Sequence, residues 1–103
     1  MKIFVHPSVE KFLKNLDSGF AAEIYSTIEL LETYGHNLSM PHTKPIGGGL
    51  WELRISGRYA SRIVYGFHKN SIVLLVALKK QKMALRRGDI ILAEERFHEY
   101  CRI

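Results

Sequence analysis

The segment WELRISGRYASRIVYGF, residues 51–67, decides the fold, because polar and apolar side chains alternate on both sides of a short turn. Alternation with a period of two is typical of strands in a sheet that buries one face. Arginines occupy several of the strand positions, Arg54 and Arg62 among them. These two share a sheet face only if the turn holds three residues and pairs Ile55 with Tyr59, whereas a two-residue turn would separate them.

Toward the N-terminus the apolar period changes from two to that of a helix. Residues 2–6 predict a short strand, and Ser8 is the expected N-cap of a first helix. A second amphipathic helix is expected over residues 20–34, followed by a loop over 35–49 that is rich in Gly, Pro, Asn and Ser. The periodic apolar positions of the first helix are Val9, Phe12, Leu13 and Leu16, and those of the second are Phe20, Ile24, Ile28 and Leu31.

Toward the C-terminus the sequence predicts an antiparallel meander and a last helix. The expected strands are residues 50–55, 59–67 and 71–79, and the expected helix is residues 85–100. Gly57 and Asn70 lie in the connecting turns, where both residue types tolerate a left-handed backbone. The order is β-α-α-β-β-β-α in one α+β domain, with a helical hairpin on one face of the sheet and the other face in water.

Basic residues concentrate in one part of the chain. The 103 residues carry a net charge of +5, but residues 1–41 hold three Lys/Arg against five acids, and residues 42–103 hold twelve against five. A positive face of this kind is typical of phosphate or nucleic-acid binding, and it is also compatible with a solvated surface that only aids solubility. Cys101 has no second cysteine to pair with, and no apolar run reaches membrane-spanning length. We therefore expect a cytoplasmic protein without a membrane partner.

No familiar metal or cofactor motif occurs. The histidines do not stand at ligand spacing, and the glycines at 47–49 lack the Lys and Ser/Thr of a phosphate-binding loop, so no metal and no cofactor is expected. A set of cations remains. Guanidinium groups suit phosphate oxygens, and RNA supplies its own nucleophile in the 2′-hydroxyl, so such a set could cleave RNA without a metal. It comprises Arg54, Arg58, Arg62, Lys79, Lys80, Lys82, Arg86 and Arg87.

These segments resemble a known family. The stretches LWELRISGRYASRIVY at 50–65, IVLLVALKKQK at 72–82 and RRGDIILAEERFHEY at 86–100 look like the RelE/ParE superfamily of type II toxins, closest to its HigB-like branch. SVEKFLKNL at 8–16 is similar to the first helix of these toxins, so the resemblance covers nearly the whole chain. It implies a RelE-like fold and a ribosome-dependent mRNA endonuclease that works without metal.

The resemblance also implies roles for individual residues. Arg54 and Arg62 match the arginines at the scissile phosphate, and the basic cluster after the last central strand matches a lysine-rich segment of the family. KKQKMAL at 79–85 departs from the usual KKTxKTP, and no general base is obvious. The implied catalytic residues are Arg54, Arg62, Lys80 and Lys82; the substrate-binding residues are Arg58, Tyr59, Lys79 and Arg86; the acid/base candidates are Tyr59, His98 and Tyr100.

Alternatives and partners complete the hypothesis. A ParE-like relative that inhibits DNA gyrase, or a decayed toxin that only binds, would share the fold. A toxin implies an antitoxin, in this branch a small helix-turn-helix protein similar to HigA that contacts operator DNA, besides ribosome and mRNA as targets. The apolar stripe of the last helix either caps the core or docks a partner. It comprises Ile90, Ala93, Phe97 and Tyr100.

Overall fold

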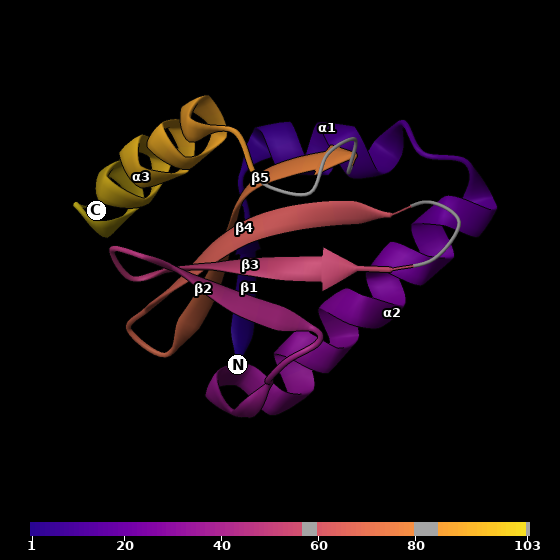
Figure 1. Cartoon of the computed structure of the whole chain (residues 1–103), viewed down its shortest axis with the longest axis horizontal. Coiled ribbons are helices and arrows are strands. Elements are labelled where there is room, and N and C mark those ends of the chain that lie inside the picture. The colour runs from indigo at the N-terminus through magenta and orange to yellow at the C-terminus, as the bar shows by residue number, and fades with distance from the viewer. Residues whose placement is uncertain (57–59, 80–84, 103) are drawn as a thin grey trace.

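Five strands form one mixed sheet in the order β1-β5-β4-β3-β2 (Figure 1). The computed structural model describes residues 1–56, 60–79 and 85–102. Its strands are β1 (Lys2–Val5), β2 (Thr43–Gly47), β3 (Leu50–Ile55), β4 (Ser61–His68) and β5 (Ser71–Lys79), and its helices are α1 (Pro7–Lys14), α2 (Ser18–Tyr34) and α3 (Arg87–Cys101), with a 3₁₀ turn at Gly35–Asn37. The α+β class, the helical hairpin, the meander of β3, β4 and β5 and the final helix are confirmed. No helix in the described ranges is long and apolar enough to cross a bilayer.

Two strand pairings were not predicted. β2 lies inside the expected loop and pairs antiparallel with β3 at one edge of the sheet. Its sequence TKPIG has little strand character, and Pro45 lacks a backbone N–H, which only an edge strand tolerates. β1 lies at the other edge and runs parallel to β5, a pairing that depends on the path of the intervening chain rather than on local sequence.

The register between β3 and β4 brings the arginines together. Arg54 pairs directly with Arg62, and Ile55 pairs with Ser61 rather than with Tyr59, as the three-residue turn considered above would have required. Residues 56–60 connect the strands, and their odd number keeps both arginines on one face, as a three-residue turn would. At the next turn Asn70 takes the expected left-handed backbone with φ of 63°.

The α1–α2 hairpin covers the first face of the sheet. The core on this side joins the two helices to β3, β4 and β5 through Leu53, Ile63, Tyr65, Ile72 and Leu74, all buried. α1 starts one residue before the expected N-cap: His6 Nδ1, not Ser8, accepts from a backbone N–H, that of Ser8, at 3.1 Å. Asp17 caps α2 by accepting from Phe20 N at 2.9 Å.

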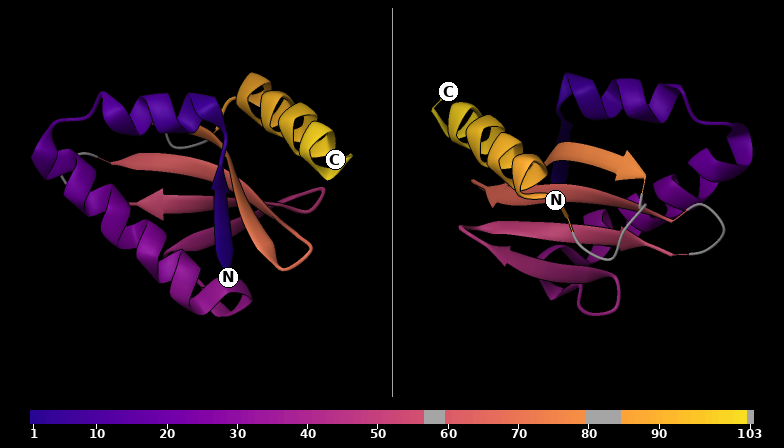
Figure 2. Two further views of the ribbon diagram at one scale, coloured as in Figure 1. Left: turned by 180° about the vertical axis from the view of Figure 1, so that it is seen from behind. Right: turned by 45° about the horizontal axis from the view of Figure 1, so that its top comes forward.

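α3 covers part of the second face, which therefore is not fully open to water as expected. Figure 2 shows α3 and the α1–α2 hairpin on opposite sides of the sheet. A second core beneath α3 contains Leu50, Val64 and Ala93, while Phe97 and Tyr100 are partly buried against it. Phe97 packs so tightly on β4 that a Cβ built on Gly66 would lie 2.7 Å from its ring. The apolar stripe of α3 thus serves mainly as core.

A bulge in β5 alters the second half of that strand. Tyr65 pairs with Leu74 and Val64 with Val76, so Leu75 is the extra residue. Arg96 of α3 donates to the carbonyl oxygen of Leu75 at 2.7 Å, which fixes α3 to the bulge. The side chains after the bulge face the opposite way from those of a regular strand.

Candidate phosphate-binding hollow

A hollow of about 240 Å³ opens on the α3 face of the sheet, between β2, β3, β4 and the start of α3. We call it the arginine hollow. Lys44, Glu52, Arg54 and Arg62 contribute its charged lining, and Pro45, Ile46, Leu85 and Ile90 surround them with apolar surface. The alternation of strand residues explains the set, because the charged members all point to the same side of three neighbouring strands.

Glu52 holds both arginines. Arg62 Nη1 donates to Glu52 Oε2 at 3.1 Å, and Arg54 Nε lies 3.3 Å from Glu52 Oε1. Arg62 and Glu52 are each 4% exposed, whereas the Arg54 side chain is 31% exposed. Of the two arginines, Arg54 is therefore the partly exposed one that an incoming ligand can reach, and Arg62 is a buried charge beside it.

Lys44 is a site residue that sequence analysis missed. It pairs with Glu52 across β2 and β3, which brings an exposed ammonium group to the rim of the hollow. The three cations and one carboxylate give the described lining a net charge of +2. Sequence analysis could not assign Lys44 to the site because Lys44 lies in the segment expected to be a loop, for which no strand pairing was predicted.

The substrate-binding candidates separate in space. Lys79 points to the opposite face of the sheet, where its Nζ lies 5.8 Å from the centre of the Phe20 ring. Arg86 is exposed at the N-cap of α3, one residue after Leu85 on the rim of the arginine hollow. Arg87 begins α3 and is also exposed. Of these predicted cations, none is part of the described lining of the hollow, although Arg86 and Arg87 directly follow its lining residue Leu85 in the chain.

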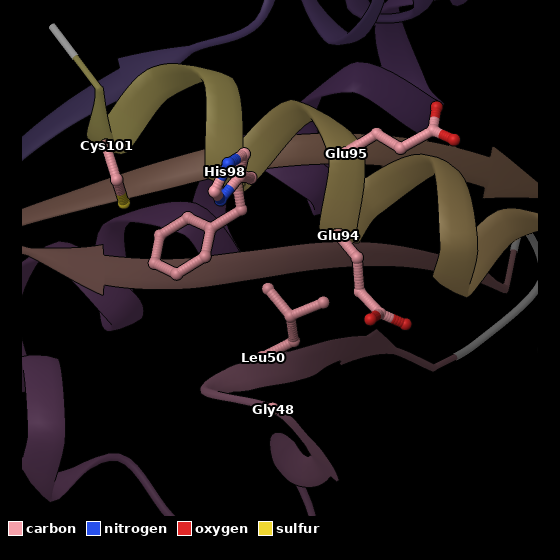
Figure 3. A pocket seen from close by; sticks show the side chains of 7 residues that line it. Gly48, Leu50, Glu94, Glu95, His98 and Cys101 are labelled. Carbon is pink, nitrogen blue, oxygen red and sulfur yellow. The ribbon is translucent and has the colours of Figure 1, made fainter.

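The acid/base candidates of α3 lie far from the arginines. His98 follows Ile90 by eight residues, or about 12 Å of helix rise. Figure 3 shows His98 beside a different hollow, of about 510 Å³, together with Glu94, Leu50 and Cys101. Its described lining contains two carboxylates and no Lys or Arg, so it does not favour a phosphate. Tyr100 contacts Phe4 and His68 instead.

Arg58, Tyr59, Lys80 and Lys82, with the turn residue Gly57, lie outside the described residues. Their positions as catalytic or substrate-binding groups remain sequence predictions. Within the ranges that the structure does describe, no three His, Cys, Asp or Glu side chains come together as a metal site.

Comparison with known proteins identifies a family. The sequence model of the family of phage-derived Gp49-like proteins (DUF891) matches residues 11–98. The match covers most of the chain and includes all residues that line the arginine hollow. No curated protein matches the chain significantly.

Proposed function

Because the chain belongs to the family of phage-derived Gp49-like proteins, a toxin-like family related to RelE, we propose that it is the toxin of a type II toxin–antitoxin system. Its activity is that of an mRNA endonuclease that cleaves on the ribosome, as in the HigB-like branch. The observation that carries the proposal is the direct pairing of Arg54 with Arg62 in one hollow whose described lining is net positive.

The geometry of the hollow suits a phosphodiester. The partly exposed guanidinium of Arg54 can donate two parallel hydrogen bonds to a phosphate through its two terminal nitrogens, and Lys44 adds a compact charge at the rim. Arg62 lies behind them at low dielectric, where a fixed cation stabilises negative charge more strongly than in water. Glu52 keeps both arginines in place without cancelling the positive charge.

The reaction itself needs few protein groups. The ribose 2′-hydroxyl gives its proton to a water molecule and attacks the neighbouring phosphorus, the bond to the 5′-oxygen breaks, and a 2′,3′-cyclic phosphate and a 5′-hydroxyl result. Arg54 and Arg62 stabilise the charge on the pentacoordinate phosphorus, and Lys80 or Lys82 donates a proton to the leaving oxygen. No described His or Tyr borders the hollow, and we propose that the ribosome aligns the 2′-hydroxyl for attack.

The partners follow from this function. The toxin acts in the cytoplasm on ribosome and mRNA and needs no cofactor. A helix-turn-helix antitoxin of the HigA type neutralises it and contacts operator DNA. Acidic residues of that antitoxin would be attracted by the arginine hollow, because the same charge that favours phosphate favours carboxylate.

Cleavage of a stalled message tests the proposal. The purified protein is added to one mRNA, once free and once in an elongation complex with an empty A site, and 5′ ends are mapped. Arg54→Gln should slow cleavage by about 100- to 1000-fold, by analogy with loss of one oxyanion-hole donor. Lys11→Gln, which removes an exposed cation from α1, should cleave at the wild-type rate.

Three results would contradict this scheme. Faster cleavage of the naked message would exclude the ribosome-dependent mechanism. Growth arrest with intact mRNA and DNA damage would instead favour inhibition of gyrase, and absence of any growth effect would indicate a decayed toxin.

Salt dependence tests the hollow separately from chemistry. Each neutralised phosphate of a single strand changes the log–log salt slope of binding by about −0.7. Arg54→Gln and Lys44→Gln should each make the slope less steep by about that amount on a DNA strand that cannot be cleaved. An unchanged slope in both variants would remove these residues from the binding site.

A further inference from the structure

Three aromatic rings meet at the end of the sheet opposite the arginine hollow. We call Phe4, His68 and Tyr100 the aromatic patch. The ring centre of Tyr100 lies 5.7 Å from that of Phe4 and 5.7 Å from that of His68. Phe4 is 43% exposed, although a large apolar ring gains free energy by burial. The patch therefore presents the partly exposed ring of Phe4, which contacts Tyr100, and Tyr100 in turn contacts His68.

Strand alternation places these rings on the α3 face. Phe4 pairs with Val73, a residue of the core beneath α3, and His68 follows Arg62, Val64 and Gly66 on the same side of β4. His68 lies six residues after Arg62, or about 20 Å along the strand. Phe97 of α3 packs on Gly66 between them, so the aromatic patch is separate from the arginine hollow.

Exposed cations border the patch. Lys2 lies two residues before Phe4 on the same face of β1, and it pairs with Ser71 beside the turn that contains Lys69. Lys2 and Lys69 are both exposed, and neither of them forms an ion pair among the described residues. Glu99 is the nearest acid in sequence, and its charge acts on His6, where it raises the pKa that burial and Arg96 lower.

The combination of an open ring and bordering cations matches one ligand class. Bases of single-stranded nucleic acid stack on aromatic side chains, and Lys and Arg bind the adjoining phosphates. We propose that the aromatic patch binds an unpaired nucleobase on Phe4, with Lys2 and Lys69 holding the flanking backbone. This contact needs no cleavage at the arginine hollow and goes beyond the proposed nuclease activity.

The α2 helix supplies a matched control. Tyr25 is 49% exposed, similar to Phe4, but α2 carries three glutamates and no Lys or Arg. An aromatic ring without bordering cations should not bind a nucleic acid. Tyr25→Leu therefore tests whether loss of any exposed ring has the same effect.

The experiment compares bases and backbone. Fluorescence anisotropy measures binding of a labelled thymidine octamer and of an abasic octamer with the same phosphates, neither of which has the 2′-hydroxyl that cleavage requires. Wild type and Tyr25→Leu should bind the thymidine octamer at least tenfold more tightly than the abasic one. Phe4→Leu, which keeps an apolar side chain, should lose that preference, and Lys2→Gln should weaken both octamers equally.

Either of two outcomes would overturn the patch as a nucleobase site. One is a base preference that Phe4→Leu and Tyr100→Leu leave unchanged while both variants unfold at wild-type temperatures. The other is equal binding of the two octamers by wild type, which would leave Phe4 as a surface for a protein partner. Arg54→Gln separates the sites, because it should lower mRNA cleavage and keep the base preference.

Discussion

The buried Glu52–Arg62 ion pair should be one of the strongest single determinants of stability in this fold. The two groups are each 4% exposed, and their charged atoms lie 3.1 Å apart. Glu52→Leu removes the carboxylate and leaves the Arg62 guanidinium charged inside the sheet. Removing one partner of a buried pair costs about 3 to 5 kcal/mol, because the remaining charge loses its counterion inside the sheet. We expect the free energy of unfolding to fall by that amount.

The double variant distinguishes a buried charge from lost packing. Glu52→Leu combined with Arg62→Met removes both charges and keeps apolar side chains of similar length, a change that is often neutral or stabilising. Arg54 also loses its contact with Glu52, but at 31% exposure its charge stays partly hydrated and the cost is small. The double variant should therefore unfold within about 1 kcal/mol of wild type and be more stable than Glu52→Leu.

Urea denaturation followed by circular dichroism measures these differences. The Lys14–Glu10 pair is the control, because its side chains are 72% and 57% exposed, and Glu10→Gln should cost less than about 0.5 kcal/mol. A Glu52→Leu variant within about 1 kcal/mol of wild type would refute the reasoning. So would a double variant no more stable than the single one.

Three further changes have effects that local geometry predicts. Gly66→Ala should lower the free energy of unfolding by about 1 to 3 kcal/mol, because the added Cβ would meet the Phe97 ring. In urea melts, a second substitution Phe97→Leu should restore part of that loss. If the effects of the two substitutions simply add in the double variant, the clash is disproved. Asp17→Ala should cost about 1 kcal/mol through loss of the α2 N-cap, and an unchanged urea midpoint would contradict that role. Burial and Arg96 lower the pKa of His6 below 6.5, so its stabilisation is present above pH 6.5 and is lost as pH falls through the folded-state pKa. The free energy of unfolding should change less between pH 7.5 and pH 5 in His6→Asn than in wild type. An equal change in both proteins would show that His6 does not contribute to the pH dependence of stability.

Local sequence was enough to predict most elements. Helical periodicity placed α1, α2 and α3 within two or three residues of their ends, and alternation placed β3, β4 and β5. Asn70 supplied the left-handed turn because its side chain tolerates that backbone. These features depend on neighbours close in the chain. The same holds for Arg54 and Arg62 as candidate site residues, since alternation along each strand is a local property.

Tertiary structure decided which charged groups meet. The pairing of β2 with β3 brought Lys44 to the hollow, and the pairing of β3 with β4 placed the buried Arg62 beside Glu52. Lys79 shows most clearly why local sequence could not predict which charged groups meet. In a regular hairpin it would share a face with Arg62, but the extra residue Leu75 shifts the register by one and turns Lys79 toward α2. A bulge is fixed by packing across the whole sheet, including Arg96 on the Leu75 carbonyl, and no local pattern in β5 predicts it.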